Sequence, residues 1–317
     1  MTLLYVDMPP ALLAEEAPEA PTRVAPFVVI TPAHNEEAFI EETIRSMLRQ
    51  TVRPLRWIIV NDGSTDRTHD IVAGYAARHP FMVLIDRQRR GERHFGNKAH
   101  AFNQGLSQCD VSEHRFIGNL DADICLEPDY FEKVLAAFER DPALGLAGGM
   151  VRTRIGNRFV SQEVALDSVA GAVQLFRREC FEQVGGYRPL PLGGIDSAAE
   201  ITARMKGWKV QTFPELRVLE NRRTGTATAP PLVSRMREGQ RYHSLGYGFL
   251  FLCLRCLYRA MDRPRIMGSL AIFTGYVRGL LNRSPILLPP DTVRYLRGEQ
   301  QAKLRRQLKA LVAGKSN

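Results

Sequence analysis

The fold is decided by residues 115–123, Arg-Phe-Ile-Gly-Asn-Leu-Asp-Ala-Asp, which predict a buried strand ending in two carboxylates. Side chains two residues apart in an extended strand point to the same side, so we expect Asp121 and Asp123 to face together. Carboxylate oxygens are the ligands that a hard divalent cation prefers. The alternative is an acidic turn with two solvated aspartates before the next helix. The rest of the chain decides between these interpretations.

Three more short apolar runs rich in β-branched residues precede this strand, at residues 27–30, 57–60 and 81–85. The segments between them have helical character, with apolar residues at helical spacing in the first, over 36–49, and a helix expected around 98–106. Strands that alternate with helices in this way predict a doubly wound, mostly parallel α/β sheet.

Ligands of such sheets bind beyond the carboxyl ends of the strands, so the polar residues that follow each strand are expected to converge. His34, Asn35 and Glu36 follow the first strand and Asp62 follows the second. Neither a Gly-x-Gly-x-x-Gly fingerprint after the first strand nor a P-loop pattern occurs in the sequence, so the usual dinucleotide and P-loop interpretations lose their main support.

Four motifs in chain order resemble those of the family 2 glycosyltransferases. They are Thr31-Pro32-Ala33-His34-Asn35-Glu36, Asn61-Asp62-Gly63-Ser64-Thr65-Asp66, Gly96-Asn97-Lys98 with Ala101 and Asn103, and Asp121-Ala122-Asp123. The resemblance covers about residues 27–220. It implies the GT-A fold and transfer of a sugar from a nucleotide-sugar with inversion of configuration.

The resemblance also implies roles for single residues. Pro32, Ala33 and Glu36 would line the nucleoside pocket, and Asp62 would accept a hydrogen bond from the base, with uracil expected. Lys98 would lie near the diphosphate or the donor sugar. The structural alternatives are that Asp62 only closes a turn and that Lys98 is a solvated helix charge.

On the metal side, the resemblance implies that Asp121 and Ala122 contact the donor and that Asp121 and Asp123 hold Mg²⁺ or Mn²⁺. Many relatives place a His in the late passage around residues 218–226, and here Glu220 or Asn221 occupies that place. Glu220 is therefore predicted as a third metal ligand. Arg222 or Arg223 could hold the diphosphate bidentately.

An inverting transfer needs a general base that removes the proton of the acceptor hydroxyl. The family usually supplies the Asp of a Glu-Asp pair, but here Ile195 stands in place of the Glu. Asp196 is the predicted base. Glu200 lies four residues later, on the same face of a helix, and is the second candidate or a group that orients Asp196. The alternative is that Asp196 only caps the helix.

Charge divides the chain unevenly within a net charge of +9. Residues 1–200 contain 21 Lys/Arg and 28 Asp/Glu, a balance of −7, and residues 201–317 contain 22 and 6, a balance of +16. Apolar segments with interspersed Arg at 249–261 and 265–283 are typical of helices that lie on an anionic membrane surface. The alternative is an ordinary helical appendage packed on the core, and a nucleic-acid partner is not expected because no known module is present.

These features predict a flexible leader over residues 1–25, a GT-A domain over 26–229 and a basic amphipathic helical extension over 230–317. We find no signal-peptide pattern and no apolar run that could span a bilayer. The five scattered cysteines, including the Cys253–Cys256 pair, favour buried thiols in a reducing compartment. A cytoplasmic location, peripheral on the membrane, is the resulting expectation.

The predicted function is metal-assisted transfer of a sugar from a nucleotide-sugar, expected to be UDP-linked, to a lipid-linked or surface-glycan acceptor in polysaccharide biosynthesis. A nucleotidyltransferase is the weaker enzyme alternative, because it would want a Gly-rich basic loop after the first strand, where this chain has Pro-Ala-His-Asn-Glu. The second alternative is a catalytically degenerate glycan-binding or scaffold protein at the membrane face.

Overall fold

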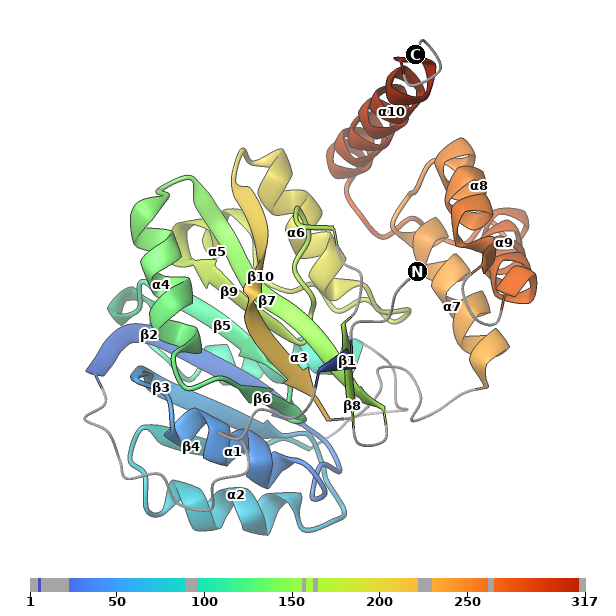
Figure 1. The fold of residues 1–317 in the computed structure, drawn as a ribbon. Coiled ribbons are helices and arrows are strands. Elements are labelled where there is room, and N and C mark those ends of the chain that lie inside the picture. The colour runs from blue at the N-terminus through green and yellow to red at the C-terminus, as the bar shows by residue number, and fades with distance from the viewer. Residues whose placement is uncertain are drawn as a thin grey trace. The chain divides into compact units, whose positions relative to one another are not determined.

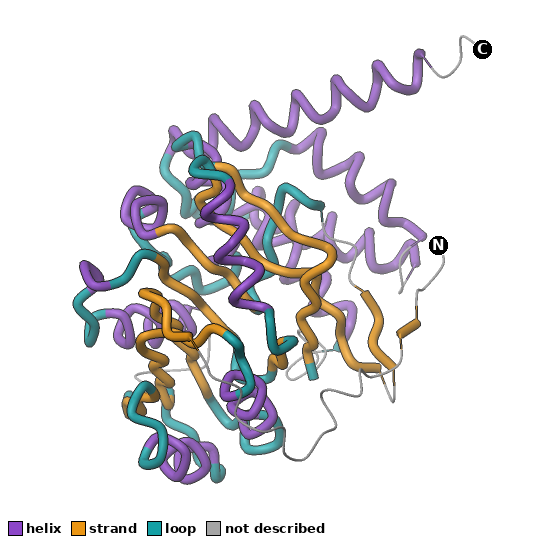
Figure 2. Tube along the Cα trace, turned by 60° about the vertical axis from the view of Figure 1, so that its left-hand side comes forward, coloured by secondary structure: helices purple, strands orange, loops and turns teal. Residues whose placement is uncertain are grey.

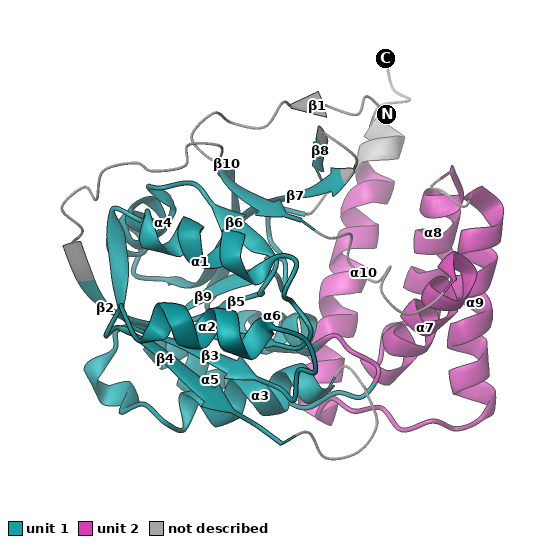
Figure 3. Ribbon diagram, turned by 90° about the horizontal axis from the view of Figure 1, so that it is seen from below, with its two compact units in different colours: residues 1–191, 195–223 teal, residues 192–194, 224–317 magenta. Residues whose placement is uncertain are grey.

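The computed structural model divides the chain into two compact units, shown in teal and magenta in Figure 3. Unit 1 comprises residues 1–191 and 195–223, and unit 2 comprises residues 192–194 and 224–317. The structure describes residues 5–6, 23–88, 96–155, 158–161, 165–221, 230–261 and 265–313. None of the helices in these ranges combines the length and the apolar character that a bilayer crossing requires.

Unit 1 contains a ten-stranded sheet (Figure 1). Its parallel part has the order β4 (Met82–Asp86), β3 (Val52–Asn61), β2 (Arg23–Ala33) and β5 (Phe116–Leu120). The strands further along the sheet are β9 (Val173–Arg177), β7 (Leu144–Ile155), β8 (Arg158–Ser161), β1 (Tyr5–Val6), β10 (Lys209–Glu220) and β6 (Ile124–Leu126). Of these, β10 runs parallel to β7, whereas β9 is antiparallel to both β5 and β7. The predicted α/β class is confirmed.

Helices cover both faces of this sheet because the central strands are apolar on both sides (Figure 2). The unit 1 helices are α1 (Ile40–Leu48), α2 (Thr68–Ala76), α3 (Gly96–Leu106), η2 (Val111–Glu113), α4 (Tyr130–Arg140), α5 (Arg178–Val184) and α6 (Ile195–Met205). Phe27 and Val29 of β2 join the large core cluster that contains residues of α1 and α4. On the other face, α3 approaches closely at Gly105, where a Cβ atom would lie 2.9 Å from the Cγ2 atoms of Ile30 and Val60.

Two segments differ from the sequence-based expectation. Strand β5 ends at Leu120, so residues 121–123 form the turn between β5 and β6 instead of continuing the pleat. Backbone bonds hold this turn, from the amide of Asp121 to the carbonyl of Ala172 (2.9 Å) and from the amide of Asn221 to the carbonyl of Asp123 (3.0 Å). For the second segment the sequence predicts a strand over residues 209–213 only, whereas β10 continues to Glu220 with an irregular register past Phe213.

Unit 2 consists of helices α7 (Pro231–Ser244), α8 (Phe249–Tyr258), η3 (Arg259–Met261), α9 (Arg265–Leu281) and α10 (Pro290–Ala313). The predicted helical extension is therefore present. The predicted boundary at 229/230 adjoins residues 222–229, which lie outside the described residues, and the arginines predicted to hold phosphate, at 222 and 223, fall in that segment. Most of the predicted leader also lies outside the described residues.

Candidate active site

The carboxyl ends of the parallel strands are aligned. Ala33 at the end of β2 pairs in register with Asn61 at the end of β3, and Asn61 pairs with Asp86 at the end of β4. On the other side of β2, Ile30 pairs with Asn119 of β5. The loops that follow these strands therefore leave one edge of the sheet, as the sequence predicted.

The loops after β2 and β3 bind each other directly. Asn35 has a φ of 56°, a left-handed conformation that Asn tolerates better than most residues. Its amide donates to Ser64 Oγ (3.0 Å), and its Oδ1 accepts from the amide of Thr65 (2.8 Å). The next amide, of Glu36, donates to Thr68 Oγ1 (2.8 Å). The first two family-like motifs thus form one hydrogen-bonded unit.

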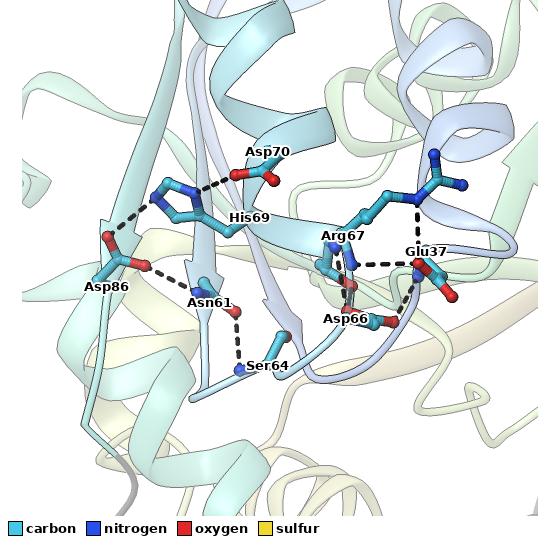
Figure 4. Close-up of polar contacts among 9 residues, drawn as sticks. Glu37, Asn61, Ser64, Asp66, Arg67, His69, Asp70 and Asp86 are labelled. Carbon is cyan, nitrogen blue, oxygen red and sulfur yellow. Dashed lines mark hydrogen bonds and ion pairs between the residues drawn. The ribbon is translucent and has the colours of Figure 1, made fainter.

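A second set of contacts fixes the loop after β3 (Figure 4). Asn61 Nδ2 donates to Asp86 Oδ1 (2.8 Å), and Asn61 Oδ1 accepts from the amide of Ser64 (3.1 Å). His69 lies between two carboxylates, with its Nδ1 3.2 Å from Asp70 Oδ1 and its Nε2 3.3 Å from Asp86 Oδ2. The hydrogen bond with Asp70 and the charge of Asp86 raise the pKa of His69. These contacts hold the loop after β3 against the end of β4 and the start of α2.

Asp66, at the end of the second motif, has a structural role. Its Oδ2 accepts from the amide of Glu37 (3.1 Å), and its Oδ1 accepts from the amide of Thr68 (3.0 Å) (Figure 4). Burial pushes the pKa of Asp66 upward, but hydrogen bonds from Thr68 and Glu37 outweigh burial and lower it. Glu37 in turn accepts from the amide of Arg67 (3.1 Å), so the two loops are joined again at this point.

Asp62, the predicted base-binding residue, is almost completely buried, with 3% of its surface exposed. Its carboxylate forms an ion pair with Arg87, and its backbone amide donates to the carbonyl of Ala33 (2.8 Å). His34 Nδ1 donates to the carbonyl of Asp62 (2.9 Å). The structure thus brings Asp62 together with the first motif, through Ala33 and His34.

Lys98 lies against Asp121 instead of extending into solvent from its helix. The two side chains form an ion pair, and Lys98 Nζ also donates to the carbonyl of Gly171 (3.0 Å). Asn119 Nδ2 donates to the same carbonyl (2.8 Å) and approaches Asp121 Oδ1 at 3.4 Å. The predicted donor-side residues Lys98 and Asp121 are therefore joined to the loop that contains Gly171.

Asp196 lies on the other side of Gly171. A Cβ atom placed on Gly171 would be 2.7 Å from Asp196 Oδ2, so the predicted base packs directly on the glycine backbone. Asp196 is the second residue of α6 and is half-buried. Gly171 therefore connects the predicted donor-side residues Lys98 and Asp121 with the predicted base.

Glu200, one turn further along α6, is buried with 5% of its surface exposed. Its Oε2 accepts from Ser168 Oγ (2.8 Å) and its Oε1 from the amide of Val169 (3.2 Å), while Arg204 lies 3.7 Å away. Burial, and then the charge of Asp196, raise the pKa of Glu200 to about 8. Both of its oxygens hold the loop that carries Gly171.

Tyr187 is a buried phenol on which the charges of Asp121, Asp196 and Glu200 act. Its hydroxyl donates to Gln174 Oε1 at 2.5 Å. Burial raises the pKa of Tyr187 well above its ordinary value, and the charges of Asp196, Asp121 and Glu200 raise it further. The three predicted carboxylates therefore all disfavour ionisation of this one buried phenol.

Two of the three predicted metal ligands lie in one turn and have the donor chemistry that a hard divalent cation requires. Asp121 and Asp123 supply hard oxygen ligands from one short turn, and Mg²⁺ is commonly held by one or two carboxylates together with phosphate oxygens and water. The described ranges contain no group of three or more His, Cys, Asp or Glu side chains that could hold a metal. Glu220 is opposite Ile124 in the sheet, and its Oε2 accepts from Thr153 Oγ1 (2.7 Å).

Sequence reasoning missed three residues of this site. Asn119 could have been found from strand periodicity, because it lies two residues before Asp121. Arg87 follows the end of β4, so the strand-end rule that selected Asp62 also selects it. Gly171 lies in a loop without a distinctive pattern, and only its packing against Asp196 identifies it.

Solved structures share this architecture. The mannosyltransferase PcManGT from Pyrobaculum calidifontis, solved in complex with GDP-Man and Mn²⁺, has a TM-score of 0.53 and 18% identity over 96% of this chain and 89% of that one. Staphylococcus aureus TarS 1-349 in complex with UDP-GlcNAc has a TM-score of 0.54 and 13% identity over 89% of this chain and 92% of that one. The fold is that of the GT-A glycosyltransferases, as predicted.

Sequence comparison gives the family. Residues 28–185 match the model of glycosyl transferase family 2, and this chain belongs to that family through this region. Poly-beta-1,6-N-acetyl-D-glucosamine synthase of Staphylococcus aureus strain COL is 26% identical over 200 residues, which cover 57% of this chain and 46% of that protein. The Staphylococcus epidermidis enzyme of the same name is 27% identical over 171 residues, 48% of this chain and 39% of that protein. The chain thus spans less than half the length of these relatives.

Proposed function

We propose that this chain is an inverting glycosyltransferase that moves a sugar from a nucleotide-sugar, expected to be UDP-linked, to a lipid-linked or surface-glycan acceptor. The observation that carries this proposal is a chain of contacts between the predicted donor residues and the predicted base. Asp121 pairs with Lys98, Lys98 donates a hydrogen bond to the carbonyl of Gly171, and Gly171 packs against Asp196. The polysaccharide synthases among the relatives support a glycan acceptor. The nucleotide-sugars bound by the structural neighbours support the donor class.

In the proposed reaction, Asp196 removes the proton of the acceptor hydroxyl. The hydroxyl oxygen forms a bond to the anomeric carbon on the face opposite the diphosphate, and the bond from that carbon to the diphosphate oxygen breaks. Asp196 suits this role because it is half-buried, at the start of α6. Glu200 is engaged at both oxygens, so we assign it a positioning role that fixes the loop against which Asp196 packs.

The nucleoside is assigned to the first two motifs, with Pro32, Ala33 and Glu36 around the base and ribose. Asp62 would accept a hydrogen bond from the base, with Arg87 holding its carboxylate in place. Asp121 and Ala122 would contact the donor beside Lys98. A Lys ammonium in this position can donate to diphosphate oxygens, since charge-assisted hydrogen bonds are shorter and stronger than neutral ones.

Asp121 and Asp123 would hold the Mg²⁺ or Mn²⁺ ion. When bound, this ion would stabilise the negative charge of the leaving diphosphate. Glu220 remains the candidate for a third ligand. It is the weakest of the three assignments, because the described residues contain no group of three such side chains placed to hold one metal ion.

Release of nucleoside diphosphate from a panel of nucleotide-sugars, including UDP-GlcNAc and GDP-Man, tests the proposal. We expect release from one donor in the presence of Mn²⁺ or Mg²⁺, and loss of release when the metal is chelated. A scaffold protein would instead bind UDP with Mn²⁺ and turn over no donor with any acceptor glycan. Absence of both binding and turnover would contradict the assigned site. A place at the cytoplasmic face of a membrane is part of the same proposal.

A further inference from the structure

Exposed apolar side chains are concentrated in one part of unit 2. The described residues include sixteen large apolar side chains that are exposed, and eleven of them belong to α8, η3 and α9. Single exposed apolar residues are ordinary on a protein surface, but a cluster usually marks a binding surface. We therefore treat this part of unit 2 as a candidate binding surface and ask which partner it fits.

The exposed residues of α8 and η3 lie on one helical face. Leu250, Leu254, Leu257, Tyr258 and Met261 are separated by four, three, one and three residues, which is the spacing of a single stripe. Leu257 is 70% exposed and Tyr258 85%. We call these five residues the apolar stripe.

Helix α8 already uses its other face for the core of unit 2. Leu252 and Cys256 are buried in a cluster with Tyr242, Ile272 and Tyr276. Helix α8 therefore packs on one side and presents a second apolar face, which no other part of the described chain covers. Ile266, Met267 and Leu270, at the start of α9, are exposed as well and extend the apolar surface beyond η3, which contacts α9.

The helices that present the stripe are fixed in place. Glu238 of α7 lies within 2.6 Å of Arg259 in η3 and 2.9 Å of Arg235, and it accepts from the Tyr242 hydroxyl at 2.6 Å. Arg255 of α8 donates to the same hydroxyl (3.2 Å). Although burial opposes its charged form, Glu238 has a pKa lowered to about 2 by Arg259 and these other partners. The stripe is therefore a preformed surface, and its binding needs no folding step.

The positive charge around the apolar stripe distinguishes between the partners that could cover it. The described residues between 230 and 313 contain 14 Lys/Arg and 3 Asp/Glu, a balance of +11, and one of the three acidic residues is the half-buried Glu238, which is already paired with arginines. Arg265, Arg278 and Arg283 are exposed on α9 and just beyond it. A second copy of this chain would bring the same positive charge against it, which opposes self-association. An apolar stripe with cationic surroundings matches the acyl and headgroup regions of an anionic bilayer.

We propose that the apolar stripe, together with the first turn of α9, docks unit 2 on the surface of an anionic membrane. The leucines and Tyr258 would enter the boundary between headgroups and acyl chains, and the exposed arginines would contact lipid phosphates. This binding deepens the membrane location included in the proposed function. It is measured without a donor, so its failure would remove that location and leave the proposed transfer reaction untouched.

Sedimentation of the full chain with vesicles tests the proposal. Vesicles of phosphatidylcholine with phosphatidylserine should bind the chain, vesicles of phosphatidylcholine alone should bind it more weakly, and salt should weaken binding to the first kind. The double variant Leu254→Glu/Leu257→Glu should reduce the partition coefficient by about a hundredfold, since each buried leucine contributes roughly tenfold or more. Leu308→Glu is the control, because Leu308 is 62% exposed on α10, outside the stripe. The partition coefficient of this variant should lie within about twofold of the wild-type value.

Three results would overturn the proposal. Wild-type chain that stays in the supernatant with both kinds of vesicle would exclude a membrane surface. Equal binding by wild type and the double variant would show that charge alone, away from the stripe, is responsible. A wild-type dimer in sedimentation velocity that Leu254→Glu/Leu257→Glu dissociates would assign the stripe to a second copy. Far-UV circular dichroism verifies that each variant is folded.

Discussion

At the scale of single residues, the site depends on one backbone carbonyl. The oxygen of Gly171 accepts from both Lys98 Nζ and Asn119 Nδ2, which uses its two lone pairs. The Cα atom of the same residue packs against the carboxylate of Asp196. Glycine is needed here because of this close approach, and a side chain of any size would displace the carboxylate of Asp196.

Gly171→Ala therefore tests the position of Asp196. The added Cβ atom would lie 2.7 Å from Asp196 Oδ2, so we expect the carboxylate to move and turnover to fall by roughly tenfold to a hundredfold, while UDP binding stays near wild type. Gly74→Ala on α2, where a Cβ atom meets nothing within 4 Å, is the matched control. Equal turnover in both variants would show that Asp196 does not need its present position.

Glu200 provides a prediction about pH. Its pKa is raised from an ordinary 4.5 to about 8 by burial and by Asp196, so the folded state binds the proton more tightly than the unfolded state. Arg204 and the phenol of Tyr187 are the other ionisable groups near it. The protonated form of Glu200 therefore contributes up to a few kcal/mol to the free energy of unfolding. This contribution is complete below about pH 4.5 and is lost as the pH rises towards about 8.

Denaturant unfolding measured between these pH values checks this. Wild type should lose stability as the pH rises through the window, and Glu200→Gln, which resembles the protonated carboxyl and can still accept from the amide of Val169, should show a flatter profile. If Glu200→Gln retains the wild-type pH dependence, the titrating group lies elsewhere. A loss of turnover at every pH in Glu200→Gln would instead favour a direct catalytic role over positioning.

At the scale of elements, the α7–α9 pair is the tightest contact in unit 2. A Cβ atom on Gly239 would lie 1.9 Å from the carbonyl of Ile272, and one on Gly275 would lie 1.9 Å from the carbonyl of Met236. The two helices therefore meet backbone to backbone, which only glycine permits at these positions. This pair supports the helices that carry the apolar stripe.

Gly275→Ala should force the helices apart and cost about 3 kcal/mol or more of unfolding free energy, as overpacking against a rigid backbone does. Gly298→Ala on α10 meets nothing within 4 Å, so it should be neutral or stabilise by up to about 1 kcal/mol through helix propensity. Thermal unfolding by circular dichroism compares the two. Equal melting temperatures would contradict the close crossing.

The elements also show what the sequence could predict. Strands β2 to β5 were predictable because apolar runs with β-branched residues alternate with helical segments, and the strand-end rule then selected Asp62 and Asp121. The length of β10 was missed because Pro214 interrupts its pattern, although pairing resumes beyond it. The turn at residues 121–123 was predicted only as the alternative to a strand end, because its backbone partners, Ala172 and Asn221, come from loops remote in sequence.

At the scale of the whole molecule, the predicted catalytic residues and the predicted membrane-binding surface belong to different units. Unit 1 gathers the carboxylates assigned to donor and base, whereas the described part of unit 2 carries the excess of positive charge and most of the exposed apolar side chains. The sequence already indicated this division through its charge balance. It did not distinguish a packed appendage from a surface helix, because exposure depends on which face of α8 packs on Tyr242 and Ile272.

The central claim is that Asp196 acts as the base of a sugar transfer from a donor held near Asp121 and Asp123. The most direct measurement compares wild type, Asp196→Asn and the surface control Asp129→Asn in metal-dependent release of nucleoside diphosphate, beside UDP binding. We predict that Asp196→Asn binds UDP like wild type and loses about a hundredfold to ten-thousandfold in turnover, while Asp129→Asn keeps both. Full turnover in Asp196→Asn would contradict the account.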